Sequence, residues 1–269
     1  MVTLTFYPKR KKTYNEQLQS DLEKITFDLT KASRKDPPAP EPVDTVSSMV
    51  TNEALKLTKW LTADTVIIVA NGPSAKGFKA PPDIPVIAVN SAVQWLNRWD
   101  WFFTLDLSAK NIINFQTALK VKRRKAVIAV PDMIVKPNQT KYPKSYVMTR
   151  LVGAPSSEPV DHTSPQWGLW RYKARLGLTR TQGAISTGNS AYGALNLAYH
   201  LGFTSTVLIG VDGTQDAGVD GDKPKDLAYL PLLFQSAEKD MYVINCGSLD
   251  GFKHVDFDVW YAGYKDTSS

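Results

Sequence analysis

Short, continuous runs of apolar and β-branched residues recur along the chain, and they constrain its fold more than any other feature. Segments with helical periodicity lie between them, most clearly at 190–201, where alanines and leucines share one side. Such runs are typical of strands buried on both faces, as in parallel sheets covered by helices. The alternation predicts a Rossmann-like, doubly wound α/β fold with a mostly parallel sheet and helices on both faces. The runs lie at 65–70, 86–89, 101–105, 126–130, 206–211 and 241–244.

A proline-rich segment separates the first part of the chain from the rest. Four prolines occur within residues 37–42, and prolines remove backbone donors and favour an extended chain. Before this segment, a basic run at 9–12 is followed by residues 13–32, whose apolar side chains have the spacing of one helix face. We therefore expect a basic helical arm with a linker at 1–44 and one Rossmann-like domain at 45–269.

An excess of basic residues favours anionic partners. The chain has 32 lysines and arginines against 26 aspartates and glutamates, a formal net charge of +6. This balance favours nucleotides, phosphates, acidic sugars, nucleic acid including DNA, or a membrane surface.

The expected compartment follows from the cysteine content and from the N-terminal sequence. The single cysteine, Cys246, excludes an intrachain disulfide and a zinc site built from cysteines, and it fits a reducing compartment. No stretch approaches the roughly 20 apolar residues needed to cross a bilayer. The basic run follows the apolar start instead of preceding it, unlike a signal peptide. We therefore expect a cytoplasmic protein without a membrane span.

Small polar residues follow the predicted strands. In an open parallel sheet, ligands bind beyond the carboxyl ends of the strands, where backbone donors and helix N-termini converge. Asparagine both donates and accepts hydrogen bonds, which suits a base edge, a ribose hydroxyl or a sugar. The same residue types also make ordinary turns and helix caps, but their recurrence favours a site. The binding candidates are Asn71, Gly72, Pro73, Ser74, Asn90, Ser91, Thr187, Gly188, Asn189, Ser190 and Asn245.

The turn at 71–74 differs from the common nucleotide-binding motifs. Gly72 allows a close backbone approach, Pro73 fixes the turn, and Ser74 can cap a following helix. The turn has neither the glycine spacing of the dinucleotide fingerprint nor the lysine of a P-loop. ATP in a P-loop and NAD in a standard Rossmann site are therefore disfavoured.

Two carboxylates, Asp106 and Asp212, directly follow apolar runs. A carboxylate at a strand end can bind ribose hydroxyls, hold a divalent metal or act as a base. It can equally close an Asx turn or cap a helix. We expect Asp106 and Asp212 to be catalytic, and to be the metal ligands if the reaction depends on Mg²⁺.

Residues 151–185 lack a clear period and mix aromatic with basic side chains, including Arg171 and Tyr172. Long irregular insertions are often lids or binding loops, and this mixture can stack on a base or sugar and neutralise a phosphate. The alternative is that the tryptophans, Trp167 and Trp170, pack under the loop while the arginines are solvated. His162 is a candidate general base, although a lone histidine in a loop is more often incidental.

A series of short motifs, taken in order, resembles a known superfamily. The motifs cover much of residues 60–255 and lie at 66–74, 89–90, 106, 187–190, 208–212 and 245–248. They resemble the superfamily that groups the bacterial family 42 sialyltransferases with the DUF115 proteins, which include archaeal 6-hydroxymethylpterin diphosphokinases. The resemblance implies a Rossmann-like transferase with a nucleotide-donor pocket. It also implies that the loop at 71–74 and Asn90 contact the CMP part of a donor, with the loop at 187–190 nearby.

The chain departs from the sialyltransferases at one position of the pattern. Those enzymes use a histidine base that follows the strand matching 206–211, whereas this chain has no histidine between Asp212 and Lys253. The resemblance to the DUF115 proteins is closer at Asp106, Asp212 and 245–248, which suits a metal-assisted attack at a phosphate.

These observations favour a transferase that uses a nucleotide-activated donor, and above all a glycosyltransferase with a nucleotide-sugar donor. The small size and the basic arm suit an enzyme that is encoded by a phage or mobile element and acts on DNA or a glycan. One alternative is an Mg²⁺-dependent diphosphokinase of the 6-hydroxymethylpterin type. The other is a non-catalytic module that binds nucleotides or nucleic acid.

Overall fold

The computed structural model describes seven stretches of the chain: 64–105, 108–121, 125–131, 145–151, 157–214, 216–221 and 227–268. The arm and linker expected at 1–44 lie outside these residues, and so does the boundary expected at 44/45. Asp106, one of the two expected catalytic carboxylates, also lies outside them.

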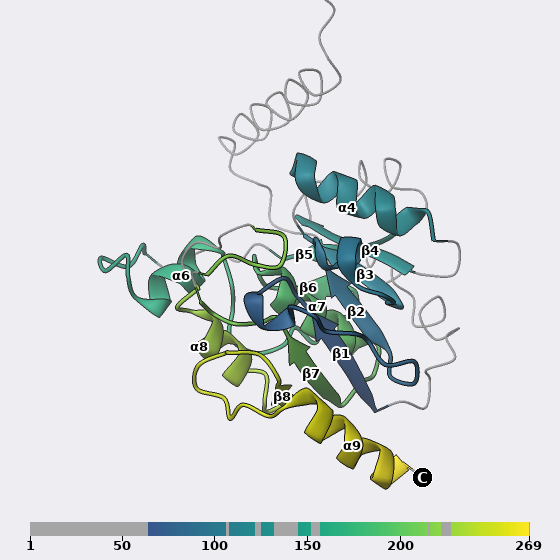
Figure 1. The fold of residues 1–269 in the computed structure, drawn as a ribbon. Helices are drawn as coiled ribbons and strands as arrows, with labels where there is room; N and C mark the ends of the chain where they lie inside the picture. Colours follow the sequence, from purple (N-terminus) through teal and green to yellow (C-terminus); the bar gives the residue numbers. More distant parts are fainter. Residues whose placement is uncertain are drawn as a thin grey trace, which may run out of the picture. The chain divides into compact units, whose positions relative to one another are not determined.

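Eight strands of the described stretches form one sheet in which every neighbouring pair is parallel (Figure 1). Their order across the sheet is β6-β5-β4-β3-β2-β1-β7-β8. The strands are β1 (Thr65–Val69), β2 (Val86–Val89), β3 (Trp101–Thr104), β4 (Lys125–Pro131), β5 (Tyr146–Arg150), β6 (Ala184–Ile185), β7 (Ser205–Ile209) and β8 (Tyr242–Asn245).

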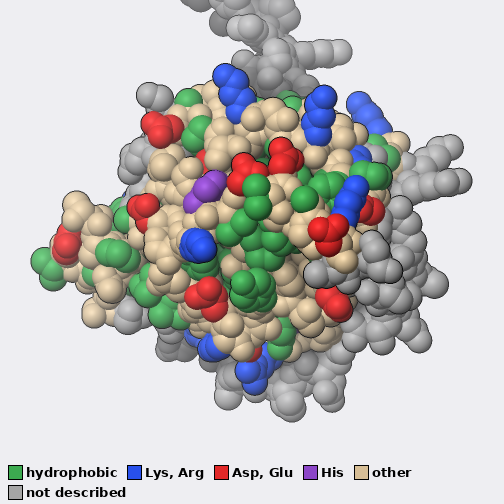
Figure 2. All heavy atoms as spheres, turned by 60° about the horizontal axis from the view of Figure 1, so that its bottom comes forward, with side chains coloured by type: hydrophobic (Ala, Val, Ile, Leu, Met, Phe, Trp, Pro, Cys, Tyr) green, Lys and Arg blue, Asp and Glu red, His purple; other side chains and the backbone are tan. Residues whose placement is uncertain are grey.

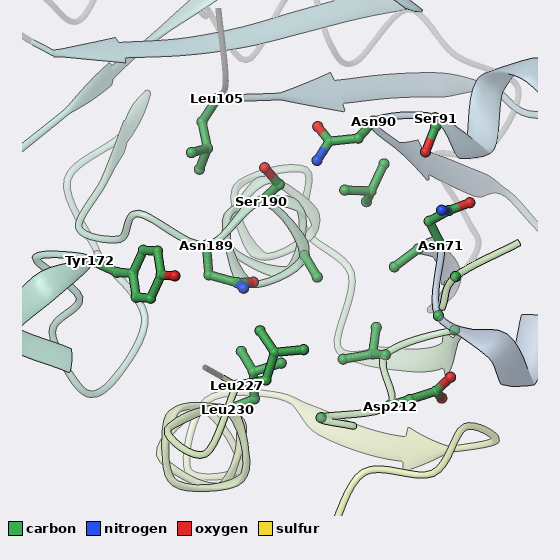
Figure 3. Close-up of a pocket in the computed structure, with 18 of the residues that line it drawn as sticks. Asn71, Asn90, Ser91, Leu105, Tyr172, Asn189, Ser190, Asp212, Leu227 and Leu230 are labelled. Carbon is green, nitrogen blue, oxygen red and sulfur yellow. The ribbon is translucent and has the colours of Figure 1, made fainter. Parts of the chain in front are cut away.

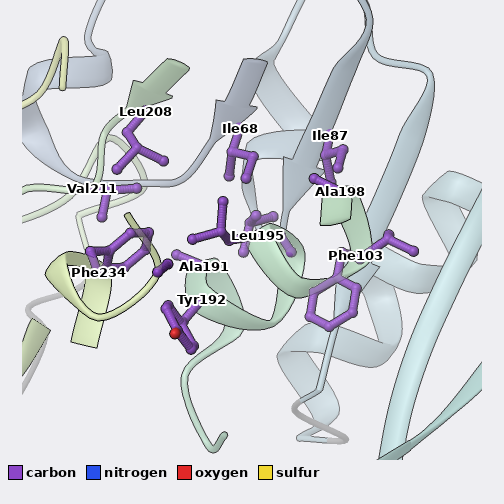
Figure 4. Close-up of a cluster of buried hydrophobic side chains, with 14 of the residues drawn as sticks. Ile68, Ile87, Phe103, Ala191, Tyr192, Leu195, Ala198, Leu208, Val211 and Phe234 are labelled. Atoms are coloured by element: carbon purple, nitrogen blue, oxygen red, sulfur yellow. The ribbon is translucent and has the colours of Figure 1, made fainter. Parts of the chain in front are cut away.

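Helices cover both faces of this sheet. On one face, α7 and α8 pack with Ile68, Ile87 and Phe103 of the central strands (Figure 4). On the other face, α3, α4 and α9 pack with the alternate strand residues. No helix in the described stretches is long and apolar enough to cross a membrane. The helices are η1 (Pro73–Ala75), α3 (Ala92–Trp95), α4 (Ala109–Leu119), α6 (Pro165–Arg171), α7 (Ser190–His200), α8 (Leu230–Gln235) and α9 (Phe257–Ser268).

The chain changes direction across the sheet at β1, which pairs with β2 on one side and β7 on the other. Strands β1 to β6 are added outward on one side, and the chain then returns to place β7 on the opposite side. Val69 is in register with both Ala88 and Ile209, so the carboxyl ends of three strands are level. In open α/β sheets, such a switch point is where ligands bind.

The predicted Rossmann-like, doubly wound fold is confirmed, and its sheet is wholly parallel. The run at 86–89 coincides with β2, and the others overlap their strands with ends that differ by one or two residues. Two strands were not predicted: β5, whose sequence mixes polar and apolar residues, and β6, which has two residues. Residues 151–185 are consequently less irregular than expected, because they contain α6 and β6.

Replacing Leu195 by alanine should lower the free energy of unfolding by about 2–5 kcal/mol, because this fully buried side chain of α7 packs against the sheet. Urea denaturation followed by circular dichroism measures the change. Ile113→Ala in α4, where the side chain is 60% exposed, should stay within about 0.5 kcal/mol of the wild type. Equal losses in the two variants would contradict the packing of α7.

Candidate functional site

A cavity of about 720 Å³ lies beyond the carboxyl ends of the strands around the switch point (Figure 3). Most of the predicted binding residues line this cavity, and Asp212 lines it as well. The candidates on its wall are Asn71, Gly72, Pro73, Asn90, Ser91, Gly188, Asn189 and Ser190.

The Asp212 carboxylate ties together the loops that follow three neighbouring strands. The side chain is 5% exposed, and its Oδ2 accepts a hydrogen bond from the Ser74 backbone N–H at 2.8 Å. Its Oδ1 accepts hydrogen bonds from the Ser74 hydroxyl and from the Ser248 N–H, the latter at 3.0 Å. Both oxygens are therefore engaged within the protein. This arrangement favours a positioning role for Asp212 over that of a base or metal ligand.

Gly72 allows the β1 loop to lie against this carboxylate. Its N–H donates to the Gly210 carbonyl at 2.8 Å. A Cβ at position 72 would overlap Oδ2 of Asp212 and would lie 2.6 Å from the Gly210 carbonyl oxygen. The glycine is thus required by close packing, since backbone atoms on the facing loop cannot move aside cheaply.

Asn71 uses both ends of its amide inside the protein. Its Oδ1 accepts from the indole N–H of Trp95 at 3.0 Å, and its Nδ2 donates to the Asp220 carboxylate. Its carbonyl oxygen accepts from the Val219 N–H at 2.9 Å. Asn71 consequently holds the segment 216–221 against the pocket, and its side chain has little capacity left for a ligand.

Asn90 presents a hydrogen-bond donor to the cavity. Its φ of 51° is in the left-handed region, which asparagine tolerates better than most residues. The Thr104 hydroxyl donates to Oδ1 at 2.9 Å, which fixes the amide so that Nδ2 points into the cavity (Figure 3). An acceptor on a ligand, such as a carbonyl or phosphate oxygen, is the natural partner of this group.

The segment before α7 is a helix cap, as one of the two interpretations of this motif predicts. The Asn189 Oδ1 accepts from the Tyr192 N–H at 3.0 Å, and its Nδ2 donates to the Tyr229 hydroxyl at 3.2 Å. The Thr187 hydroxyl accepts from the Asn189 N–H at 3.0 Å. These residues hold the start of the helix, and Ser190, the first helical residue, directs its hydroxyl toward the cavity (Figure 3).

Four of the described candidates do not line the cavity: Ser74 and Thr187, whose hydrogen bonds are given above, and Asn245 and His162. Asn245 is 2% exposed and shapes the loop after β8, donating to the Leu249 carbonyl at 3.2 Å and accepting from the Gly247 N–H at 3.1 Å. His162 is 60% exposed, pairs with Glu158 at 3.1 Å and packs on the ring of Trp167. The geometry therefore lends no support to His162 as a base.

The two interpretations of residues 151–185 each describe part of this segment. Arg171 and Tyr172 line the cavity, as the lid hypothesis expects. Trp167 packs under the Arg171 guanidinium, which lies 4.8 Å from the centre of its ring, as the structural alternative expects. Tyr172 stacks on Tyr229 with 5.1 Å between ring centres.

Arg150 and the apolar walls of the pocket were not predicted from the sequence. Arg150 is the last residue of β5 and lines the cavity, and burial lowers the pKa of its guanidinium. Its only sequence signal is a charge at the end of a short mixed run, which is too weak to identify a strand. The apolar walls include Leu105, Leu227 and Leu230 (Figure 3).

The single cysteine follows β8 and is poorly suited to act as a nucleophile. Cys246 is buried, and burial, followed by the charge of Asp256, raises the pKa of its thiol to about 12. A thiol with this pKa is protonated at neutral pH and is a poor nucleophile. Within the described stretches, no group of three or more histidine, cysteine, aspartate or glutamate side chains could hold a metal ion.

No protein-family model matches the chain, and no curated protein sequence does. Several solved structures have a similar fold. One is the sialyltransferase CstII from Campylobacter jejuni with the substrate analogue CMP, at 14% identity over 68% of this chain and 79% of that chain, with a TM-score of 0.41. The same enzyme with CMP-3FNeuAc is 14% identical over 67% of this chain and 79% of that chain, with a TM-score of 0.40. A variant of that enzyme with CMP is 15% identical over 68% of this chain and 80% of that chain, with a TM-score of 0.38. At these identities the likeness concerns the fold alone.

Replacing Gly72 by alanine should lower the free energy of unfolding by roughly 1–3 kcal/mol, because the new Cβ overlaps the Asp212 carboxylate and the facing backbone. Thermal and chemical denaturation measure the loss. Gly263→Ala is the matched control: this glycine lies in α9 with nothing within 4 Å of a new Cβ. The control should gain about 0.5–1 kcal/mol from helix propensity. A neutral Gly72→Ala would argue against the close approach at Asp212.

Proposed function

We propose that the chain is a transferase that takes its group from a nucleotide-activated donor, and that this group is a sugar. The observation that supports the proposal best is the composition of the cavity at the switch point. It combines the inward-facing Asn90 amide, the Ser190 hydroxyl and the Arg150 cation with walls of leucine and tyrosine. Its volume of about 720 Å³ lies within the range of about 300–1,000 Å³ typical of small-molecule sites.

The chemical types on the wall match the parts of such a donor. Neutral groups that donate or accept, such as Asn90 and Ser190, suit a base edge or sugar hydroxyls. Leucine side chains, together with Tyr172, suit the flat face of a base or a sugar ring. The guanidinium of an arginine suits a phosphate.

Glycosyl transfer requires a group that removes a proton from the acceptor. The acceptor oxygen attacks the anomeric carbon, and the bond from that carbon to the phosphate oxygen breaks. The electron pair leaves with the phosphate, while the acceptor proton passes to a base. Among the described carboxylates of the cavity, Asp212 accepts from two serines and Asp220 from Asn71, whereas Asp216 has no hydrogen-bond partner within the described stretches. Asp216 is therefore our candidate for the base.

The two alternative functions have weaker support. The diphosphokinase needs Mg²⁺, and of its two expected ligands Asp106 lies outside the described residues and Asp212 has both oxygens engaged. The binding module depends on the basic arm, which also lies outside them. On the face of the described part in Figure 2, acidic and basic side chains are interspersed, so this face offers no basic patch for DNA. A glycan or DNA acceptor stays a prediction.

Replacing Asn90 by glycine should weaken binding of the nucleotide sugar by roughly tenfold, the cost of one hydrogen bond of about 1.4 kcal/mol. Glycine adopts the left-handed backbone of position 90 without strain, so the variant removes the amide and keeps the turn. Calorimetric titration with a panel of nucleotide sugars first identifies the donor and then measures the change.

The control for this variant is Thr204→Ala. Thr204 is exposed and precedes β7, so it lies at the amino edge of the sheet, opposite the cavity. The Thr204→Ala variant should bind the donor as the wild type does. If no nucleotide or nucleotide sugar binds the wild type, the proposed function is wrong.

Replacing Asp216 by asparagine should lower the transfer rate at least roughly 100-fold, the scale of general-base catalysis, while donor affinity changes little. A coupled assay for nucleotide release, with a glycan or DNA acceptor, measures the rate. Asp250→Asn, an exposed carboxylate that does not line the cavity, should keep full activity. Equal rates for Asp216→Asn and the wild type would remove Asp216 from the mechanism.

A further inference from the structure

We infer that Arg150 and the first residues of α7 form a subsite for the phosphate of the donor. The inference rests on the proposed function and names the part of the pocket that binds the leaving group. Arg150 was not among the predicted site residues and belongs to no sequence motif. It is the last residue of β5, a strand that was not predicted from the sequence.

Among the described residues, Arg150 is a cation without a counter-charge. Its Nε is completely buried and has no hydrogen-bond partner, and no carboxylate of the described residues pairs with it. The residue as a whole is only partly buried, but a charge that loses part of its hydration and gains no compensating interaction is still costly. A ligand anion in the cavity would supply that compensation.

Because Gly188 has no side chain, the Arg150 guanidinium can lie against the loop that leads into α7. A Cβ at position 188 would lie 3.1 Å from Nη2 of Arg150 and would overlap the carbonyl oxygen of Tyr172. Any other residue at position 188 would therefore compete with both neighbours for the same space. The absence of a side chain leaves the guanidinium close to the start of the helix.

The first turn of α7 offers further donors at the same place. The Asn189 cap satisfies the N–H groups of Tyr192 and Gly193. The N–H groups of Ser190 and Ala191, two residues that line the cavity, have no acceptor among the described residues. α7 has eleven residues, so the positive end of its dipole adds to these donors.

The two signs of charge on the cavity wall come from different elements. Its arginines belong to β5 and α6, whereas Asp212, Asp216 and Asp220 all belong to the segment after β7. Burial is the cause of the lowered pKa of Arg150, with no contribution from an acidic neighbour. A phosphate at Arg150 therefore meets a basic wall, while the proposed proton acceptor lies on the acidic one.

The test compares nucleoside monophosphates with the corresponding nucleosides by calorimetric titration of the full chain. For the base that binds, Arg150→Gln should weaken the monophosphate roughly 10- to 100-fold, the range for hydrogen bonds to a charged group. Binding of the nucleoside should stay unchanged. Arg175→Gln, an exposed arginine that does not line the cavity, is the control and should bind both as the wild type does.

Ser190→Pro provides a second variant if Arg150→Gln does not fold. Proline is well tolerated at the first position of a helix, and the preceding Asn189 is already extended with φ −100° and ψ 126°, as a residue before proline requires. The variant removes one N–H and one hydroxyl from the subsite. It should weaken the monophosphate and spare the nucleoside.

The outcomes separate the subsite from the proposed function. Selective loss of monophosphate binding supports the subsite. Unchanged monophosphate binding, or equal loss for monophosphate and nucleoside, overturns the subsite while donor binding itself stands. If neither compound nor any nucleotide sugar binds the wild type, the proposed function fails and the subsite fails with it.

Discussion

The hydrogen bonds of one buried carboxylate, Asp212, hold the site in place. The loops after β1, β7 and β8 have no covalent cross-link to one another, and each could turn away from the sheet. Asp212 receives donors from the first and third of these loops, and Gly72 provides the space for this approach. Because β1 and β7 also flank the switch point, this carboxylate fixes one wall of the cavity, and the rest of the proposed chemistry depends on that wall.

Residue type alone does not tell which polar residues hold the pocket and which face a ligand. Three asparagines occur in turns next to buried elements: Asn71, Asn189 and Asn90. The side-chain amides of the first two form hydrogen bonds within the protein. Asn90 keeps its Nδ2 toward the cavity because Thr104 occupies only its oxygen. The distinction lies in long-range partners that no local motif encodes.

The sequence predicted the layers of the fold and the sheet edge on which the cavity lies, for a simple physical reason. Buried parallel strands such as β1 and β2 need continuous apolar runs, and these are visible without a structure. The strand β5 was missed because Tyr146 and Arg150 are only half buried and break its run. Arg150 belongs to this strand, and the three donors to Asp212 come together only when distant loops meet.

The measurement that tests this account most directly is a crystal structure of the chain with a bound nucleoside monophosphate. We expect the base and ribose in the cavity near Asn90, and the phosphate within hydrogen-bonding distance of the Arg150 guanidinium and the N–H groups of Ser190 and Ala191. A nucleotide bound outside this cavity, or one whose phosphate points away from Arg150 toward the acidic wall, would contradict it.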